Sequence, residues 1–265
     1  MTSSDLAEGA PRGKDGGRVD NRAFPERSRH SQVVQTLGRQ IVRGDRETGS
    51  PLPIEDRLVT ELGVGRSAVR EGVKILVGKG LLETRTSAGT LVRARDSWSL
   101  LDPDVLRWRF VSDPEPRDIK ILADLRVALE PGAARVAAER ADAAANQRIA
   151  ETLAALYATT DDPDAFIEAD LAFHRAVFAA SDNDLLLYLY EVISIALRSV
   201  RQVHTRAIKH NKETLPNHER VAVAIRRGHH RKAEEAMREV VEVARADAED
   251  QILCCGQAPS TPTKE

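Results

Sequence analysis

Cysteine and aromatic residues are scarce in this 265-residue chain. The two cysteines, Cys254 and Cys255, are adjacent in a polar tail, which excludes both a disulfide scaffold and a cysteine-based zinc site. Aromatic side chains make up 4% of the residues. This scarcity, with abundant Ala, Leu, Val and Arg, favours helices over a β-sandwich or barrel. We expect a reducing location, the cytoplasm.

Long apolar runs are also absent. No stretch approaches the roughly 18 to 20 apolar residues of a membrane-spanning helix. Charges stand near the N-terminus where a secretory signal needs an apolar core, so we expect no membrane partner. The composition, 42% hydrophobic and 30% charged, is typical of a globular protein with one large or two modest domains.

Acidic and basic residues are divided unevenly along the chain. The formal net charge is −2, but residues 1–95 carry 17 basic and 12 acidic side chains, and the remainder carries 22 and 29. A basic front half joined to an acidic back half indicates that only the first part meets a polyanion.

The front of the chain shows the pattern of a winged helix-turn-helix. Residues 1–29 are rich in Gly, Pro and charge without an apolar period, so we expect a disordered arm. After it, apolar spacing predicts three short helices and then two strands, over 30–43, 55–62, 66–79, 81–86 and 90–93. Two short helices around a glycine turn, followed by a hairpin, predict a DNA-binding domain over 30–95.

The back of the chain is helical almost throughout. Residues 96–116 contain three prolines and both tryptophans and are predicted to be a linker whose apolar residues dock on one of the domains. The expected helices cover 117–141, 144–157, 164–180, 184–204, 215–227 and 230–251. Short turns between them predict an antiparallel helical bundle over 117–253, followed by a tail, 254–265. The fold class is therefore mainly α.

Short motifs in the front half occur in a fixed order and spacing. They are Gly49-Ser50-Pro51-Leu52-Pro53, Glu55, Leu62-Gly63-Val64, Arg66-Ser67, Val69-Arg70-Glu71, Lys79-Gly80-Leu81 and Gly89. This series resembles the winged helix-turn-helix of the GntR family of bacterial transcription regulators. Gly65 departs from the pattern, because the family usually has a polar helix-capping residue there.

The back half resembles the all-helical FCD domain of the FadR subgroup of that family. The resemblance rests on Leu125-Arg126-Val127-Ala128-Leu129-Glu130-Pro131, Asp170-Leu171-Ala172-Phe173-His174 and Asn217-His218-Glu219. The linker, from Trp98 through Leu100-Leu101-Asp102-Pro103-Asp104-Val105-Leu106-Arg107-Trp108, is similar to that of sugar-acid regulators of the galactonate-operon type. The resemblance implies a repressor of sugar-acid catabolism genes that is released by a small carboxylic acid.

The resemblance also implies which residues contact an operator in double-stranded DNA. Arg66 and Arg70 would read bases and Ser67 would contact phosphate, since the second helix of such a domain enters the major groove. Position and charge add Arg57 and Arg85 as phosphate contacts, and Gly89 at the wing tip lets backbone approach the minor groove. The alternative is that these are solvated charges and an ordinary hairpin glycine. Such regulators usually read two half-sites, so we expect a homodimer.

A carboxylate and an imidazole lie one helical turn apart at Asp170 and His174, a spacing that can chelate a divalent metal such as zinc. His218 is the third candidate ligand. The family pattern places a last histidine at position 240, where this chain has Val240. A polar cluster in the bundle core without metal is the alternative interpretation.

The same region is the expected effector site. Arg126 would pair with the acid group of a sugar acid, and Thr214, one turn before His218, would bind its hydroxyls. Asp170 and His174 complete the expected site. Two other functions compete: a metal-dependent hydrolase or lyase built on Asp170, His174 and His218, and an architectural DNA binder without an effector. The first lacks an accompanying nucleophile or general-base motif, so we expect no enzyme.

Overall fold

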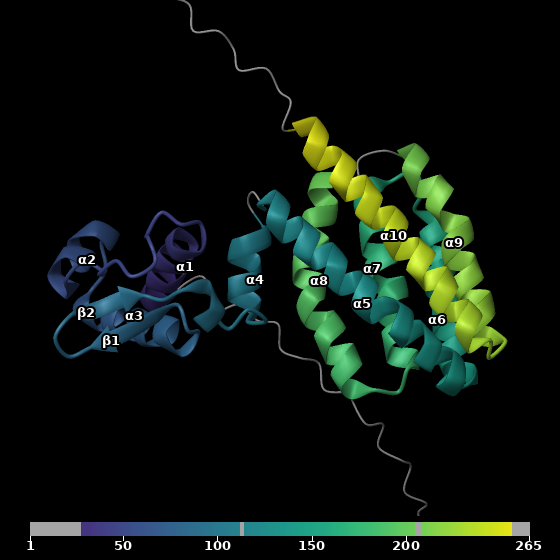
Figure 1. The fold of residues 1–265 in the computed structure, drawn as a ribbon, viewed down its shortest axis with the longest axis horizontal. Coiled ribbons are helices and arrows are strands. Elements are labelled where there is room, and N and C mark those ends of the chain that lie inside the picture. The colour runs from purple at the N-terminus through teal and green to yellow at the C-terminus, as the bar shows by residue number, and fades with distance from the viewer. Residues whose placement is uncertain (1–27, 112–113, 205–207, 256–265) are drawn as a thin grey trace, which may run out of the picture.

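The computed structural model describes residues 28–111, 114–204 and 208–255, which form two lobes joined by a short helix (Figure 1). The expected arm and tail fall almost entirely outside these residues. Among the described helices, none has both the length and the apolarity that a membrane crossing needs.

The N-terminal lobe is the expected winged helix-turn-helix. Its three helices are followed by two antiparallel strands, paired from Leu82 with Val92 to Arg85 with Gly89. The bounds lie within a residue or two of the predicted ones: α1 Arg29–Val42, α2 Glu55–Leu62, α3 Arg66–Gly78, β1 Leu82–Arg85 and β2 Gly89–Val92.

One apolar face of each helix builds the core of this lobe. Val33, Leu37 and Ile41 of α1 are buried at helical spacing and pack in one cluster with Leu58 of α2 and Leu76 of α3. Because the opposite faces of α2 and α3 are polar, this packing leaves those faces in solvent.

The C-terminal lobe is an antiparallel bundle of helices. In it α5 packs along α10, α6 lies against α7 and α9, and α7 also contacts α5 and α8. The helix expected over 215–227 begins earlier, because Pro216 removes only one backbone donor and the helix continues on both sides of it. The bounds are α5 Pro116–Arg140, α6 Ala143–Ala158, α7 Pro163–Ala180, α8 Asp184–His204, α9 Ile208–Arg226 and α10 His230–Cys255.

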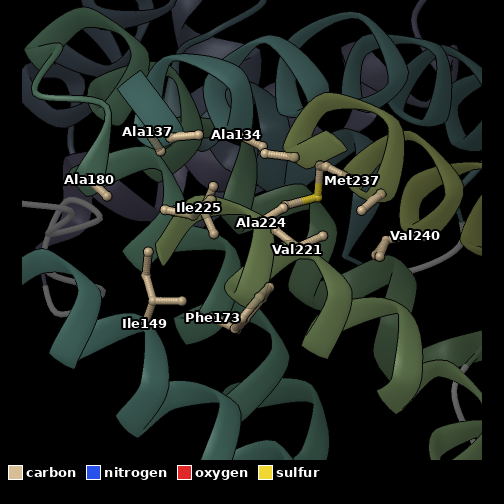
Figure 2. Packing of buried hydrophobic residues seen from close by; sticks show 14 of the residues in the cluster. Ala134, Ala137, Ile149, Phe173, Ala180, Val221, Ala224, Ile225, Met237 and Val240 are labelled. Atoms are coloured by element: carbon tan, nitrogen blue, oxygen red, sulfur yellow. The ribbon is translucent and has the colours of Figure 1, made fainter. Parts of the chain in front are cut away.

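Apolar side chains from five helices fill the middle of the bundle. Figure 2 shows Ile149, Phe173, Ile225, Met237 and Val240, which come from α6, α7, α9 and α10 and pack with alanines of α5. Small alanines on α5 let the other helices approach closely. Position 240, where the family pattern has a histidine, is thus part of an apolar core.

The segment between the lobes is partly helical and docks on both of them. A turn of 3-10 helix, Arg95–Ser97, precedes α4, Pro103–Phe110, which begins at the N-cap Asp102. Val105 and Trp108 of α4 belong to the core of the N-terminal lobe, and Leu106 and Phe110 belong to a core cluster of the bundle. The prediction of docking on one domain was wrong, because α4 buries apolar residues on two faces.

Trp108 fixes α4 against α1. Its Nε1 donates a hydrogen bond to Oε1 of Gln35 at 2.8 Å. Its ring covers Gly38 so closely that a Cβ there would lie 2.4 Å from Cη2 of the indole. The lack of a side chain at Gly38 therefore permits the close approach of α1 and α4.

Ion pairs tie α4 to its neighbours on both sides. Nζ of Lys79, at the end of α3, lies 2.9 Å from Oδ2 of Asp104. On the other side, Nη2 of Arg109 lies 2.7 Å from Oδ1 of Asp118 in α5, and Arg95 contacts the same carboxylate. Burial raises the pKa of Asp118, but the two guanidinium groups outweigh it and hold the pKa below its usual value. The lobes are therefore joined by charge as well as by apolar contact.

Replacing Gly38 with alanine tests this joint. We expect Gly38→Ala to lower the free energy of unfolding by about 1–3 kcal/mol, because the new methyl group overpacks against Trp108. Urea unfolding followed by tryptophan fluorescence measures the change, since both tryptophans lie beside the joint. Gly132→Ala, in α5 with open space around it, is the matched control and should be neutral or slightly stabilising. A Gly38→Ala protein as stable as the control would contradict the proposed packing.

Candidate functional site

The first turns of α3 present polar side chains to solvent. Arg66, Ser67 and Arg70 are exposed, whereas Val69 is buried in the lobe. Gly65 is the N-cap and makes no side-chain cap hydrogen bond. The exposed amide end of the helix and its arginines therefore lie on one face, which suits a polyanion.

Acidic side chains of α2 hold the two arginines in place. Nε of Arg70 donates to Oε2 of Glu55 at 2.6 Å, and Nη2 of Arg66 lies 3.0 Å from Oδ1 of Asp56. Arg70 is 67% exposed. Exposed ion pairs of this kind contribute little to stability because solvent screens them, so a base or phosphate can replace them.

The wing and α2 supply the other expected DNA contacts. Gly89 has φ of +74° and open space around the position of a Cβ, so backbone there can approach a partner closely. Arg85 is the strand partner of Gly89. Its Nη2 lies 2.5 Å from Oε1 of Glu83. Arg57 is exposed on α2. Figure 1 shows α2 and the turn of the wing at the side of this lobe farthest from the bundle.

A second group of expected residues meets inside the bundle. Arg126 of α5, Asp170 and His174 of α7 and His218 of α9 are at most 6% exposed. Buried charges of this density are costly unless they are paired, so their position needs a physical or functional reason.

Asp170 lies at the centre of this group. Nε2 of His218 is 3.1 Å from its Oδ1, and Nε2 of His174 is 3.8 Å from its Oδ2. The ring of Phe173 meets both histidine rings edge-on, with centroids 5.8 and 5.2 Å away. The apolar core therefore surrounds the group and fixes the rings.

Two charged residues of the site were missed by the sequence analysis. Glu130 is fully buried, accepts from Nε of Arg126 at 2.6 Å and places Oε2 2.6 Å from Nδ1 of His174. Arg201 of α8 contacts Oδ2 of Asp170 and is 15% exposed. The spacing of four residues from Arg126 could have revealed Glu130, but no motif marks Arg201.

Burial and neighbouring charges shift the titration of these groups. Burial opposes the charge of Glu130, yet Arg126 and His174 hold its pKa well below the usual value. Burial and the cationic groups around it lower the pKa of His218 to about 3, so this ring is neutral at pH 7. Burial and the charge of Arg126 lower the pKa of Arg201 to about 9, which leaves it protonated.

Hydrogen bonds fix which ring nitrogens face Asp170. Nδ1 of His218 lies 3.0 Å from the carbonyl oxygen of Thr214 and its Nε2 lies 3.1 Å from Oδ1 of Asp170, so each ring nitrogen faces an oxygen acceptor. The neutral His218 ring has one N–H for these two acceptors. Nδ1 of His174 faces Oε2 of Glu130 at 2.6 Å, so its other nitrogen, Nε2, faces Asp170. The hydroxyl of Thr214 as a ligand of the effector stays a prediction.

The donor set suits a cation but fits a divalent metal only in part. One ligand atom each from Asp170, His174 and His218 lies within 4.8 Å of the others. However, Arg201 already contacts the second oxygen of Asp170. Val240 is 6% exposed within an apolar cluster and supplies no fourth ligand. The site thus has three residues of the types that bind metals, and the guanidinium of Arg201 contacts one of them.

Comparison with known proteins identifies both lobes. The sequence model of the family "Bacterial regulatory proteins, gntR family" matches residues 29–92, and that of the FCD domain matches residues 122–243. The galactonate operon transcriptional repressor of Escherichia coli K12 is 37% identical over 196 residues, which cover 74% of this chain and 86% of the repressor. The regulator LutR of Bacillus subtilis is 32% identical over 202 residues, covering 74% and 90%.

A solved structure supports the fold. Lar, described as controlling the agr system of Listeria monocytogenes, has a TM-score of 0.51 at 15% identity, covering 86% of this chain and 99% of that one.

Alanine substitutions on α3 test the DNA-contacting face. We expect Arg66→Ala and Arg70→Ala each to weaken operator binding by about 1–3 kcal/mol, because an arginine reads guanine through paired donors. Arg85→Ala should weaken binding to operator and scrambled DNA alike, as a phosphate contact does. Fluorescence anisotropy with both DNAs measures the two effects.

The control for these variants is Arg148→Ala, which removes an exposed arginine from α6 in the other lobe. If the α3 variants bind the operator as this control does, the expected contacts are wrong.

Proposed function

This chain belongs to the GntR family of bacterial regulatory proteins, and we propose that it represses sugar-acid catabolism genes until a small carboxylic acid releases it from DNA. It is a DNA-binding transcription regulator with an FCD domain and not an enzyme. The name of the similar galactonate repressor supports an aldonate as effector. A regulator that reads operator DNA works in the cytoplasm.

The observation that carries the effector proposal is an unused donor on a buried cation. Nη2 of Arg126 is buried and has no hydrogen-bond partner among the described residues, although its Nε is bonded to Glu130. An unsatisfied guanidinium donor in a protein interior costs about 1–3 kcal/mol. A carboxylate oxygen of an acid ligand would satisfy it, and the low dielectric of the interior would strengthen the pair.

A path of packed helices joins this site to the DNA-contacting face. The site draws residues from α5, α7, α8 and α9, and α8 packs against α4. In turn α4 packs on α1 through Trp108 and Gly38. A shift of α8 on effector binding would therefore move the winged domain. By linkage, a releasing acid binds the free protein more tightly than the DNA complex, typically by about 1–3 kcal/mol.

Operator reading requires a second copy of the chain. A single winged domain offers one recognition helix, α3, and the expected operator has two half-sites about one helical turn apart. We therefore include a homodimer in the proposal. A hydrolase or lyase at Asp170, His174 and His218 is not supported, because the similar proteins and both domains are regulators. A divalent metal at those residues remains the alternative cation for the site.

Titration with sugar acids tests the effector. Operator sites are first selected from a random DNA pool, and D-galactonate, related aldonates and the uncharged galactitol are then added to the labelled complex. We expect one aldonate to lower anisotropy and galactitol to have no effect, because Arg126 needs a carboxylate. Arg126→Gln should bind operator normally but lose release by at least about tenfold.

The matched control is Arg135→Gln, an exposed position on the same helix. Specific operator binding that no acid alters, in either the wild type or the control, would instead support the architectural DNA binder.

The oligomeric state is checked separately by light scattering after size-exclusion chromatography. The chain has a mass of 29.1 kDa. We expect twice this mass for the free protein, and twice this mass plus that of the DNA for the complex with a two-half-site operator. A monomer in both conditions would refute the homodimer.

A further inference from the structure

Arg201 places a cation beside residues that resemble a metal site. It comes from α8, whereas Asp170 and His174 come from α7 and His218 from α9. Its Nη1 contacts Oδ2 of Asp170, and its side chain is 15% exposed. A long cationic side chain is rarely placed so deep without a partner, so its presence here needs an explanation.

Oxygen and nitrogen atoms converge where Arg201 enters the site. Asp170 presents two oxygens, and Nε2 of His218 and Nε2 of His174 face them at 3.1 and 3.8 Å. Oδ2 of Asp170 and Nε2 of His174 make no hydrogen bond among the described residues, so they need a cation or a donor beside them. Arg201 brings a positive charge to Oδ2 of Asp170.

Each arginine of the site already contacts one carboxylate. Arg126 contacts Glu130, and Arg201 contacts Asp170. A divalent ion would add two positive charges to a buried site, while a monovalent acid changes the balance by one. Val240 supplies no further ligand to offset the difference.

We propose that Arg201 takes the place of a metal ion in this site and, with Arg126, binds the carboxylate of the effector. The replacement of a metal by Arg201 is inferred from its contact with Asp170 and from the incomplete set of metal ligands, and it needs no acid ligand. The binding of the effector carboxylate rests on the proposed function, because it needs an acid ligand. Effector binding is accordingly independent of metal.

The first experiment uses Zn²⁺ alone and does not depend on the effector. Full-length protein is treated with chelator, its metal content is checked by mass spectrometry, and Zn²⁺ is titrated by calorimetry. We expect weak binding by the wild type and binding at least about tenfold tighter by Arg201→Gln, which frees Asp170. Arg198→Gln, one turn earlier on α8 and exposed, should match the wild type.

The second experiment titrates chelator-treated protein with D-galactonate and related aldonates. We expect the acid affinity to be the same with and without chelator. Arg201→Gln should weaken it by at least about tenfold, and Arg201→Lys should weaken it less because it keeps the charge. Circular dichroism and operator binding check that each variant is folded. If Arg201→Gln does not fold, the acid affinities of Arg201→Lys and Arg198→Gln are compared instead. The inference then requires weaker acid binding by Arg201→Lys.

Two results would overturn the inference. One is that the wild type binds Zn²⁺ tightly and binds the acid only when Zn²⁺ is present. The other is a folded Arg201→Gln protein with unchanged acid affinity. If no aldonate binds although operator binding is intact, the proposed effector class fails. The Zn²⁺ titration then decides by itself whether Arg201 replaces a metal.

Discussion

The buried carboxylate of Asp170 is the constraint on which the effector lobe depends. A charge that is 3% exposed inside an apolar bundle requires compensation. Arg201 brings a positive charge to it from α8, the rings of His174 and His218 lie beside it, and Glu130 and Arg126 extend the same set of contacts. The site joins α5, α7, α8 and α9. A ligand that changes the contacts around the Asp170 carboxylate therefore acts on all four helices. This property suits a domain that converts ligand binding into movement.

A short helix carries that movement to the DNA. The two faces of α4 belong to two different cores, and its ion pairs with Lys79 and Asp118 attach it to both lobes. The lobes are therefore not joined by a free tether. At the other end, Arg66 and Arg70 rest on weak exposed ion pairs with α2, which DNA can replace. The protein thus has a stable joint in the middle and an adaptable surface at its end.

The sequence predicted most of the fold because its elements are locally encoded. Apolar spacing placed α1, α2 and α3 almost to the residue, and the spacing of four residues put Asp170 and His174 on one face of α7. Two features depend on tertiary context and were not predictable. Residues 96–116 were predicted to be a linker, and the helix α4 within them was not predicted, because its apolar residues are explained only by the surfaces of the two cores that they contact. Arg201 has no motif, since only the fold brings α8 to Asp170.

The most direct test of this account is a crystal structure of the protein bound to the acid that releases its DNA, with anomalous scattering recorded to identify metals. The account predicts the carboxylate of the ligand on the guanidinium groups of Arg126 and Arg201, with no anomalous peak beside Asp170. A metal ion held by Asp170, His174 and His218, with the acid bound to it and Arg201 turned away, would contradict it.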